Sequence, residues 1–287
     1  MDHRFSRGRR AATALTLTLI CALAAALGAR AADAEAVASL RLYTIDCGQI
    51  EVSDMSDFSD TGEYDGQSAT LASPCFLVRH PKGTLLWDLG LGDRKDGVTD
   101  GPFHLVVRKS LSSQLAQIGL KPGDVGMLAF SHLHWDHTGN ANAFPQATWL
   151  IPKAEFEWAT SLPTPGGVDL DSISAYRAAK VVTFEGDRDV FGDGSVRILR
   201  ANGHTPGHSV LMLKLKNSGT VVLSGDLYHA MRSRRERLIP AFNVSRADTL
   251  ASIERIERIV QASRARFVIQ HAREAVDALP KFPAYLD

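Results

Sequence analysis

Hydrophobic residues recur along this chain with two different periods, and the period separates predicted strands from predicted helices. Alternating or short continuous apolar runs bounded by turn residues are typical of strands. Such runs occupy residues 40–45, 75–79, 84–88, 127–130, 148–151, 196–199, 209–215, 221–223 and 267–269. The Pro81-Lys-Gly83 turn predicts a hairpin between the second and third runs, and Asn217-Ser-Gly219 predicts another turn between the seventh and eighth.

Apolar residues spaced three and four positions apart predict helices between these strands. Residues 111–118 show this spacing and are followed by helix-ending Gly and Pro residues. A second helix is predicted near 154–160. Ser245 and Asp248 match a capping box, and the apolar positions of residues 250–260 give the following helix one hydrophobic face.

The hydrophobic residues of segment 48–67 show neither the strand period nor the helix period. The segment is acidic and contains glycine, with Met55, Phe58 and Tyr64 scattered through it. It is predicted to be a long loop, and long loops inside a compact domain tend to serve a site or stay mobile. A solvated connection is the plain alternative.

The order of the elements predicts the class of fold. Strands dominate, helices fall between them, and no linker divides the chain after residue 31. With 287 residues and 45% hydrophobic content, the chain can bury one large core. The pattern favours sheets packed on one another, helices outside, and ligands held by loops at one edge.

Residues 1–31 are predicted to be a signal peptide rather than a part of the domain. Arginines crowd the first ten positions, an Ala-rich apolar run covers 11–27, and Ala29-Arg30-Ala31 resembles a cleavage site. The apolar run is short for a membrane anchor. We therefore expect a periplasmic or secreted protein that consists of residues 32–287, with no membrane anchoring.

Removal of this segment changes the charge of the chain. The full sequence has 32 Lys and Arg against 32 Asp and Glu, and residues 1–31 contain five arginines and one aspartate. The remainder has a net charge near −4, which argues against a nucleic-acid partner. Cys47 and Cys75 can form a disulfide in an oxidising compartment, or remain two buried thiols.

The most informative cluster lies between Ser131 and Asn140, where three histidines and an aspartate fall within six positions. His132 and His134, at i and i+2, can grip one ion, while Asp136 and His137 face another direction and can grip a second. Imidazole and carboxylate ligands favour zinc, with iron, manganese or cobalt possible. Solvated or core histidines are the alternative interpretation.

Three later segments supply further donors. His204 lies in a glycine-flanked turn, Asp226 follows Ser-Gly at the end of a strand, and His271 follows the last strand. Each residue alone is more often structural. Their shared position after short hydrophobic strands favours one common site.

In this order, the residues resemble the metallo-β-lactamase superfamily, with the His-x-His-x-Asp-His motif as its most specific feature. The resemblance implies an α/β fold, an αββα sandwich in a single domain, with the site along the edge that its two sheets share. It implies that His132, His134 and His204 hold one metal and that Asp136, His137 and His271 hold the other, with Asp226 bridging both. By the same resemblance, Asp88 orients a ligand histidine and His208 supports the site without ligating.

Within the superfamily the chain is most similar to the secreted N-acyl-homoserine lactone lactonases. The similarity rests on residues 46–48, 74–77 running on to 86–88, and 279–285. Many lactonases have a substrate-contacting tyrosine three residues after the bridging aspartate. Here that position is His229, preceded by Tyr228, and either residue can take the role. Relatives are commonly homodimers.

The implied activity is quorum quenching, by hydrolysis of a small-molecule acyl lactone. Two zinc ions about 3.5–4 Å apart can share a hydroxide that attacks the ester carbonyl. Asp226 would fix the separation of the ions, and Asp136 could carry a proton to the leaving oxygen. Candidates for contact with the acyl chain, with ordinary packing as the alternative, are Met55, Phe58, Trp135 and Phe242.

Other functions are less compatible with the sequence. Relatives that hydrolyse β-lactams generally lack the bridging aspartate, and a glyoxalase II would need a substantial domain after His271, where only 16 residues follow. Redox relatives need an electron-carrier domain or a thiol substrate site, and neither is visible. An organophosphate triesterase would differ only in the shape of its pocket. A non-catalytic metal-binding module is the alternative from outside the enzymes.

Overall fold

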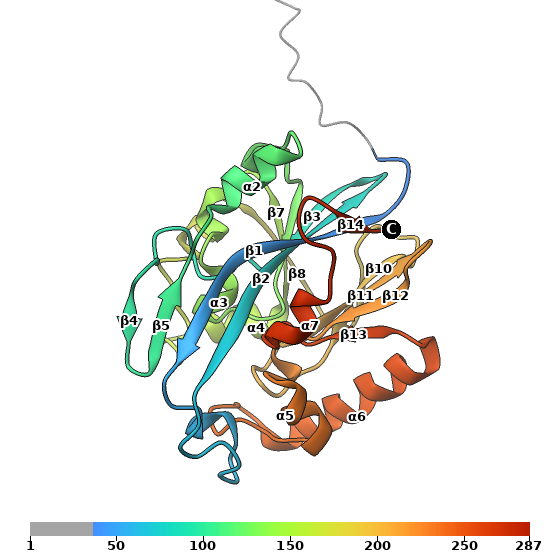
Figure 1. Cartoon of the computed structure of the whole chain (residues 1–287). Helices are drawn as coiled ribbons and strands as arrows, with labels where there is room; N and C mark the ends of the chain where they lie inside the picture. The colour runs from blue at the N-terminus through green and yellow to red at the C-terminus, as the bar shows by residue number, and fades with distance from the viewer. Residues whose placement is uncertain (1–36) are drawn as a thin grey trace, which may run out of the picture. The chain divides into compact units, whose positions relative to one another are not determined.

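Two β-sheets packed against each other form the frame of residues 37–287, the part of the chain that the computed structural model describes (Figure 1). The predicted signal peptide lies outside these residues. The strands are β1 (Arg41–Val52), β2 (Ala69–His80), β3 (Gly83–Trp87), β4 (Thr99–Asp100), β5 (Phe103–Val106), β6 (Met127–Ala129), β7 (Thr148–Pro152), β8 (Lys180–Phe184), β9 (Arg188–Asp189), β10 (Val196–Arg200), β11 (Ser209–Leu215), β12 (Gly219–Leu223), β13 (Arg266–Val268) and β14 (Tyr285–Leu286).

Short helices and one long helix connect these strands. The α-helices are α2 (Leu111–Gln117), α3 (Trp135–Thr138), α4 (Lys153–Ala159), α5 (Met231–Glu236), α6 (Arg246–Ser263) and α7 (Arg273–Asp277). The 3-10 helices are η1 (Ser56–Phe58), η2 (Pro122–Asp124), η3 (Ala141–Ala143), η4 (Ser174–Arg177) and η5 (Gly225–Leu227). Within residues 37–287, none of the helices combines the length and the apolar character needed to cross a bilayer.

The first sheet is antiparallel on one side and parallel on the other. Its order is β4-β5-β1-β2-β3-β6-β7-β8, with β14 paired to β1. β1, β2 and β3 pair antiparallel, whereas β3, β6, β7 and β8 run parallel. The second sheet has the order β13-β12-β11-β10-β9, in which only β12 and β13 are parallel. This arrangement confirms the predicted αββα sandwich.

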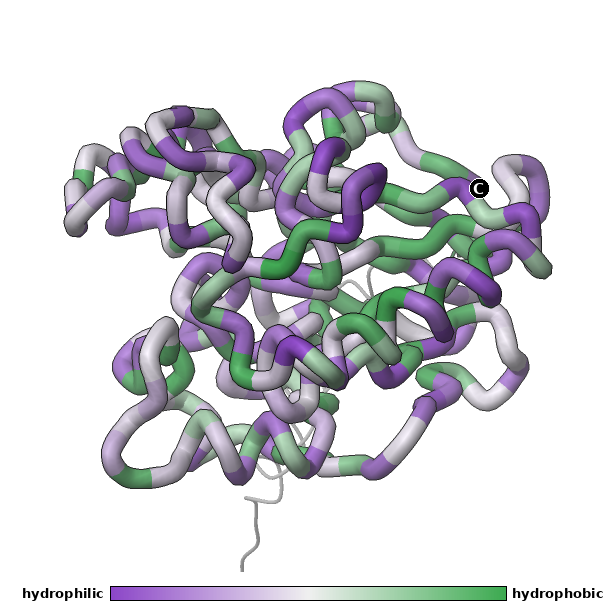
Figure 2. The backbone as a smooth tube through the Cα atoms, turned by 90° about the horizontal axis from the view of Figure 1, so that it is seen from below, coloured by the Kyte–Doolittle hydropathy of each residue, from purple (hydrophilic) through white to green (hydrophobic). Residues whose placement is uncertain are grey.

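The core lies between the two sheets, and a second apolar layer lies outside the second sheet. Phe76 and Trp87 of the first sheet pack in one buried cluster with Leu211 and Leu223 of the second. Alternate residues of β10–β12 face the other way and pack on the apolar face of α6, including Ile256. Figure 2 shows hydrophobic stretches on strands in the middle of the molecule and hydrophilic stretches mostly on loops at its margin.

The predicted loop over residues 48–67 is wrong in its first part. β1 continues to Val52, because a β-bulge between Asp46 and Gln49 interrupts the alternation without ending the pairing with β2. Met55, Phe58 and Tyr64 are buried in one apolar cluster rather than scattered over a solvated connection. Because the bulge interrupts the alternation of apolar and polar residues, the sequence pattern does not reveal that the strand continues.

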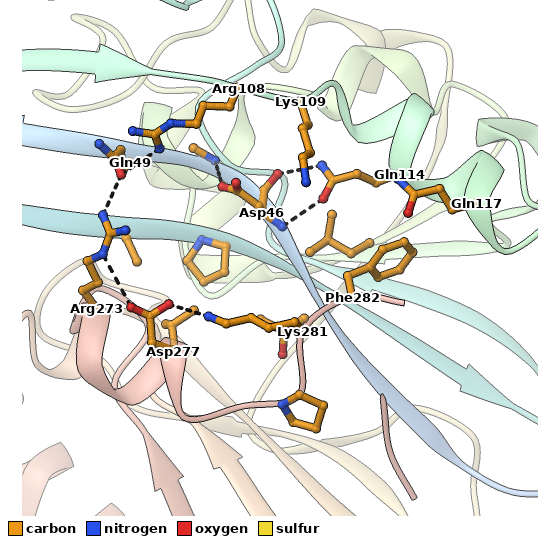
Figure 3. Close-up of a pocket in the computed structure, with 17 residues that line it drawn as sticks. Asp46, Gln49, Arg108, Lys109, Gln114, Gln117, Arg273, Asp277, Lys281 and Phe282 are labelled. Atoms are coloured by element: carbon orange, nitrogen blue, oxygen red, sulfur yellow. Dashed lines mark hydrogen bonds and ion pairs between the residues drawn. The ribbon is translucent and has the colours of Figure 1, made fainter. Parts of the chain in front are cut away.

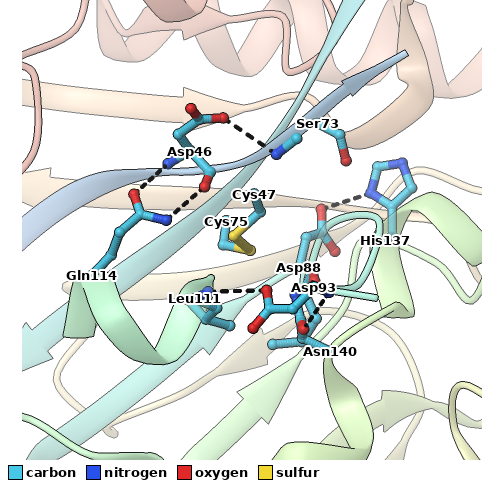
Figure 4. Close-up of a disulfide and its surroundings, with 12 residues drawn as sticks. Asp46, Cys47, Ser73, Cys75, Asp88, Asp93, Leu111, Gln114, His137 and Asn140 are labelled. Atoms are coloured by element: carbon cyan, nitrogen blue, oxygen red, sulfur yellow. Dashed lines mark hydrogen bonds and ion pairs between the residues drawn. A yellow bond between two sulfur atoms is a disulfide. The ribbon is translucent and has the colours of Figure 1, made fainter. Parts of the chain in front are cut away.

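A disulfide supports the loop that carries Asp88. Cys47 on β1 and Cys75 on β2 are joined, with their Cα atoms 5.7 Å apart, so the disulfide alternative holds (Figure 4). Gly90 packs directly on Cys47, at a φ of +61°. Gly139, next to α3, is pressed against the backbone of Leu91 and donates its N–H to the Gly90 carbonyl at 2.8 Å. The disulfide, this loop and α3 therefore form one packed stack.

This close packing predicts the effect of one added methyl group. At Gly139 the backbone is in the right-handed helical region, so alanine is strained only by collision with Leu91. We expect Gly139→Ala to lower the free energy of unfolding by about 1–3 kcal/mol, measured by urea denaturation. Gly123→Ala is the control, because a Cβ atom there meets nothing within 4 Å. Equal stability of the two variants would contradict the packing argument.

Candidate metal centre

The seven side chains predicted as ligands converge at one edge of the sandwich, where strands of both sheets end. The chain reaches the edge after β6 of the first sheet and after β10, β12 and β13 of the second. Five of the seven are buried, and two are partly exposed. In chain order they are His132, His134, Asp136, His137, His204, Asp226 and His271.

Three imidazoles form the first group. His132 Nε2 lies 2.9 Å from His134 Nδ1, and His204 Nε2 lies 3.1 Å from each of these atoms. Nitrogens bound to one zinc ion at about 2.0–2.1 Å stand roughly 3.3 Å apart, so the spacing fits a shared cation. Burial lowers the pKa of His132 and His204 well below the ordinary value and that of His134 to about 4. All three are therefore neutral near pH 7, the form that binds metal.

The second group combines two imidazoles with two carboxylates. His137 Nε2 and His271 Nε2 lie 3.2 Å apart, and Asp226 Oδ1 lies 3.0 Å from each. Asp136 Oδ2 is 3.6 Å from His137 Nε2 and 3.5 Å from His271 Nε2. Burial opposes protonation of His137, but the carboxylates of Asp226, Asp136 and Asp88 outweigh it and raise its pKa well above the ordinary value. Three carboxylates this close together in a largely buried site need a positively charged partner.

Asp226 links the two groups. Its Oδ1 faces the second group, whereas its Oδ2 lies 3.7 Å from His132 Nε2 and 3.4 Å from His204 Nε2. Oδ1 is buried and accepts no hydrogen bond of suitable geometry, although two imidazole nitrogens lie 3.0 Å from it. An orphaned carboxylate oxygen among imidazole nitrogens is costly in a protein interior unless a cation neutralises it. The donor set and this orphaned oxygen both fit a pair of bound divalent cations.

Hydrogen bonds on the far side of the rings orient the second group. Asp88 Oδ2 lies 3.0 Å from His137 Nδ1 (Figure 4). The same oxygen accepts from Gln270 Nε2 at 2.8 Å. Asp88 Oδ1 accepts from Ser131 N at 2.7 Å. His271 Nδ1 donates to the Ala72 carbonyl of β2 at 2.7 Å. These contacts leave Nε2 of both histidines facing the cluster.

His208 supports the cluster without joining it. Its Nδ1 donates to the Ala201 carbonyl at 2.8 Å, and its Nε2 accepts from the backbone N–H of Asp226 at 2.8 Å. Burial lowers the pKa of His208 to about 4, which keeps Nε2 an acceptor. The ring therefore fixes the backbone that carries the shared carboxylate.

Tyr228 and His229 point in opposite directions. The Tyr228 hydroxyl donates to Glu257 on α6 at 3.0 Å, and the side chain is 1% exposed. His229 Nε2 lies 3.0 Å from Asp226 Oδ2, and its ring stacks on that of His271 with centroids 5.4 Å apart. Of the two candidates, His229 faces the cluster and Tyr228 does not.

Aromatic side chains border the cluster on one side. Phe58 meets the His229 ring edge-on at 5.2 Å, and Phe242 meets His204 at 5.8 Å. Phe242 is 43% exposed, whereas Met55 is buried beneath. Trp135 is partly buried and packs with Phe103 at 6.0 Å. Of the four predicted acyl contacts, Phe242 packs on the cluster residue His204, and Phe58 packs on His229 beside the cluster.

Sequence analysis missed several residues that hold the ligands. Asn243 accepts from His204 Nδ1 at 2.8 Å, and Gln270 bonds to Asp88 and to the indole N–H of Trp87. Glu155 on α4 is fully buried, and burial raises its pKa to about 7 although three donors contact it. Gln270 was detectable as the neighbour of His271. Glu155 gave no signal, because an acidic residue in a short helix resembles a solvated one.

A separate cavity lies away from this centre. It has a volume of about 300 Å³, is lined by residues of β1, β2, α2 and α7, and contains none of the cluster residues (Figure 3). On its wall, Gln49 Oε1 accepts from both Arg108 and Arg273, and Lys281 pairs with Asp277. The predicted ligands therefore do not open into this cavity.

Comparisons with known proteins agree with this geometry. Residues 69–271 match the metallo-beta-lactamase superfamily. N-acyl homoserine lactonase AttM of Azorhizobium caulinodans is 28% identical over 86% of this chain and 99% of its own length. N-acyl homoserine lactonase AiiA of Bacillus thuringiensis subsp. kurstaki is 25% identical over 86% of this chain and 98% of its own length.

Solved structures share the fold. A quorum-quenching N-acyl homoserine lactone hydrolase superposes with a TM-score of 0.76 at 24% identity, covering 88% of this chain and 100% of its own. The hydrolase AbOPH superposes with a TM-score of 0.58 at 19% identity, over 84% of this chain and 92% of its own. The family match spans most of the chain and both halves of the ligand cluster. The chain belongs to the metallo-beta-lactamase superfamily.

Proposed function

We propose that this protein is a dinuclear-metal hydrolase that opens the lactone ring of N-acyl homoserine lactones. The observation that carries the proposal is Asp226, one carboxylate placed between a three-histidine group and a mixed histidine–aspartate group. The similarity to AttM and AiiA, both N-acyl homoserine lactonases, supports the choice of substrate. A structure with the same fold has the product N-hexanoyl-L-homoserine at its catalytic metal centre.

We assign the residues to two zinc ions, with cobalt, manganese or iron as possible substitutes. His132, His134 and His204 would hold one ion, and Asp136, His137 and His271 the other, with Asp226 shared. When bound, such a pair supplies an activated water near neutral pH and a Lewis acid for the ester carbonyl. No serine or cysteine nucleophile is then required.

The chain's own side chains bind and orient the lactone. His229 stands beside Asp226 Oδ2, with its ring stacked on that of His271, and can donate a hydrogen bond to the substrate. Phe58 and Phe242 offer an apolar surface for the acyl chain. Asp136, one of the two partly exposed members of the cluster, could take up the proton that the attacking water releases and pass it to the leaving alkoxide oxygen.

We also propose that residues 1–31 direct export to the periplasm or the medium. The Cys47–Cys75 disulfide supports this location, because disulfides persist in oxidising compartments. The mature protein would then act on lactones outside the cytoplasm.

Metal removal combined with a substrate panel tests the function. We expect hydrolysis of homoserine lactones of varied acyl length, loss of nearly all activity after exhaustive chelation, and recovery on addition of zinc. The measurement is ring opening followed by proton release. Untouched lactones alongside cleaved phosphotriesters or β-lactams would refute the substrate, and full activity after chelation would refute the metal.

Replacement of the shared carboxylate is the sharpest test of the two-ion assignment. We expect Asp226→Asn to reduce metal content and kcat/KM together, the latter by about 100-fold or more, because the amide keeps the shape but loses the bridging charge. Asp277→Asn, on the exposed surface of α7, is the control. Retention of two metal equivalents with full activity would reject a bridging role.

Variants of the adjacent residues Tyr228 and His229 distinguish a substrate contact from a packing contact. We expect His229→Phe to raise KM for lactones about tenfold, since a hydrogen-bonding group beside the centre is lost. Tyr228→Phe removes only the bond to Glu257 and should leave KM unchanged while lowering the free energy of unfolding by about 0.5–1.5 kcal/mol. Steady-state kinetics and urea unfolding of both variants decide. If Tyr228→Phe raised KM and His229→Phe did not, Tyr228 rather than His229 would contact the substrate.

A further inference from the structure

Glu155 is a buried carboxylate outside the predicted ligand set that contacts both loops of the three-histidine group. It lies in α4, 22 residues beyond Leu133 in the chain, and its exposed fraction is 0%. Its Oε1 accepts from the backbone N–H of Leu133 at 2.8 Å. Its Oε2 accepts from the Thr205 hydroxyl at 2.7 Å and from the backbone N–H of Gly207 at 2.9 Å.

Two of these donors are immediate neighbours of the predicted ligands, and the third, Gly207, lies three residues after His204. Leu133 stands between His132 and His134, and Thr205 follows His204 directly. The loops they belong to are separated by about 70 residues of chain, and their imidazoles meet at nitrogen–nitrogen distances near 3 Å. The Glu155 side chain therefore forms hydrogen bonds with both loops, next to the place where their imidazoles meet.

The turn at Gly207 is pressed against the same helix. A Cβ atom on Gly207 would collide with the backbone and Cβ of Glu155, so this turn rests directly on α4. The carboxylate thus acts at a fixed distance from both loops. Its three hydrogen-bond donors are all neutral, with no Lys or Arg among them.

The second group has its own support. Asp88 contacts the ring of His137 and the side chain of Gln270 beside His271, on a different loop and against a different part of the first sheet. None of the Glu155 hydrogen bonds reaches Asp136, His137 or His271. Asp88 also accepts from the backbone N–H of Ser131 beside His132, so of these two buried carboxylates only Glu155 confines its hydrogen bonds to the three-histidine half.

We propose that Glu155 is a positioning residue specific to the three-histidine half of the centre, clamping the 132–134 loop to the 204–207 turn so that three imidazoles face one cation. The proposal rests on the two-ion centre described under the proposed function. It assigns Glu155 no contact with the substrate. It follows that loss of the clamp weakens one metal site and leaves the other intact.

Glu155→Gln tests this without changing the size of the side chain. An amide can accept on one side only, and its NH2 group would oppose the N–H of Leu133 or of Gly207. We expect zinc affinity at one of the two sites to fall about 10–100-fold, as loss of a support behind metal ligands typically causes. The readout is zinc titration of metal-free protein against a chromophoric chelator, with metal stoichiometry after dialysis.

Two further variants keep the test decisive. Glu157→Gln makes the same charge change two residues along α4 on an exposed side chain and should bind two equivalents as the wild type does. Thr205→Val deletes one hydroxyl of the clamp and should weaken the same site as Glu155→Gln, to a smaller extent. If Glu155→Gln fails to fold, as judged by circular dichroism of the metal-free protein, Thr205→Val carries the test.

The outcomes separate this inference from the proposed function. Unchanged binding at both sites, or equal weakening of both, would overturn the clamp. Selective weakening of one site in Glu155→Gln and Thr205→Val, with Glu157→Gln unaffected, would establish it. A wild-type protein that binds two zinc ions but leaves lactones intact would remove the proposed substrate and leave the role of Glu155 standing.

Discussion

The structure depends on the electrostatics of donors that face one another in a buried space. The neutral imidazoles of the first group hold their nitrogen lone pairs about 3 Å apart, where these repel one another, and burial removes the water that would screen them. A divalent cation turns this repulsion into attraction. Because the donors come from distant segments, metal binding and the final packing of these loops are coupled. Asp226 is the centre of this constraint, since its two oxygens face different groups of histidines.

The sandwich brings these donors together because several of its strands end at one edge. β6 of the first sheet and β10, β12 and β13 of the second deliver short, tight loops to the same place. Loops of this kind hold a position only if something rigid lies behind them. Close glycine contacts at Gly90 and Gly139 and the Cys47–Cys75 disulfide provide that backing for the second group. The contact of Gly207 with α4 provides it for the first.

Polar groups outside the ligand set complete the centre. Asp88, Glu155 and His208 are all buried, and each binds a ring, a backbone N–H or both next to a ligand. Such hydrogen bonds fix which ring nitrogen faces inward and limit the rotation of each imidazole. The exposed side of the centre is different, because aromatic residues such as Phe242 border it. A rigid polar back and an apolar front suit a small, weakly charged substrate.

The sequence by itself determined the local features: most strands, the amphipathic α6 and the cluster at 132–137, because four of the seven candidate donors are close neighbours in the chain. It did not separate Tyr228 from His229, since adjacent residues in extended backbone point to opposite sides and only packing against α6 selects the side. Nor did it find Glu155, whose burial results from contacts with loops far away in sequence. The tertiary structure decided every feature that depends on contact between segments far apart in the chain. The order of residues reveals the period of a helix or strand, but it does not give the distance in space between two loops.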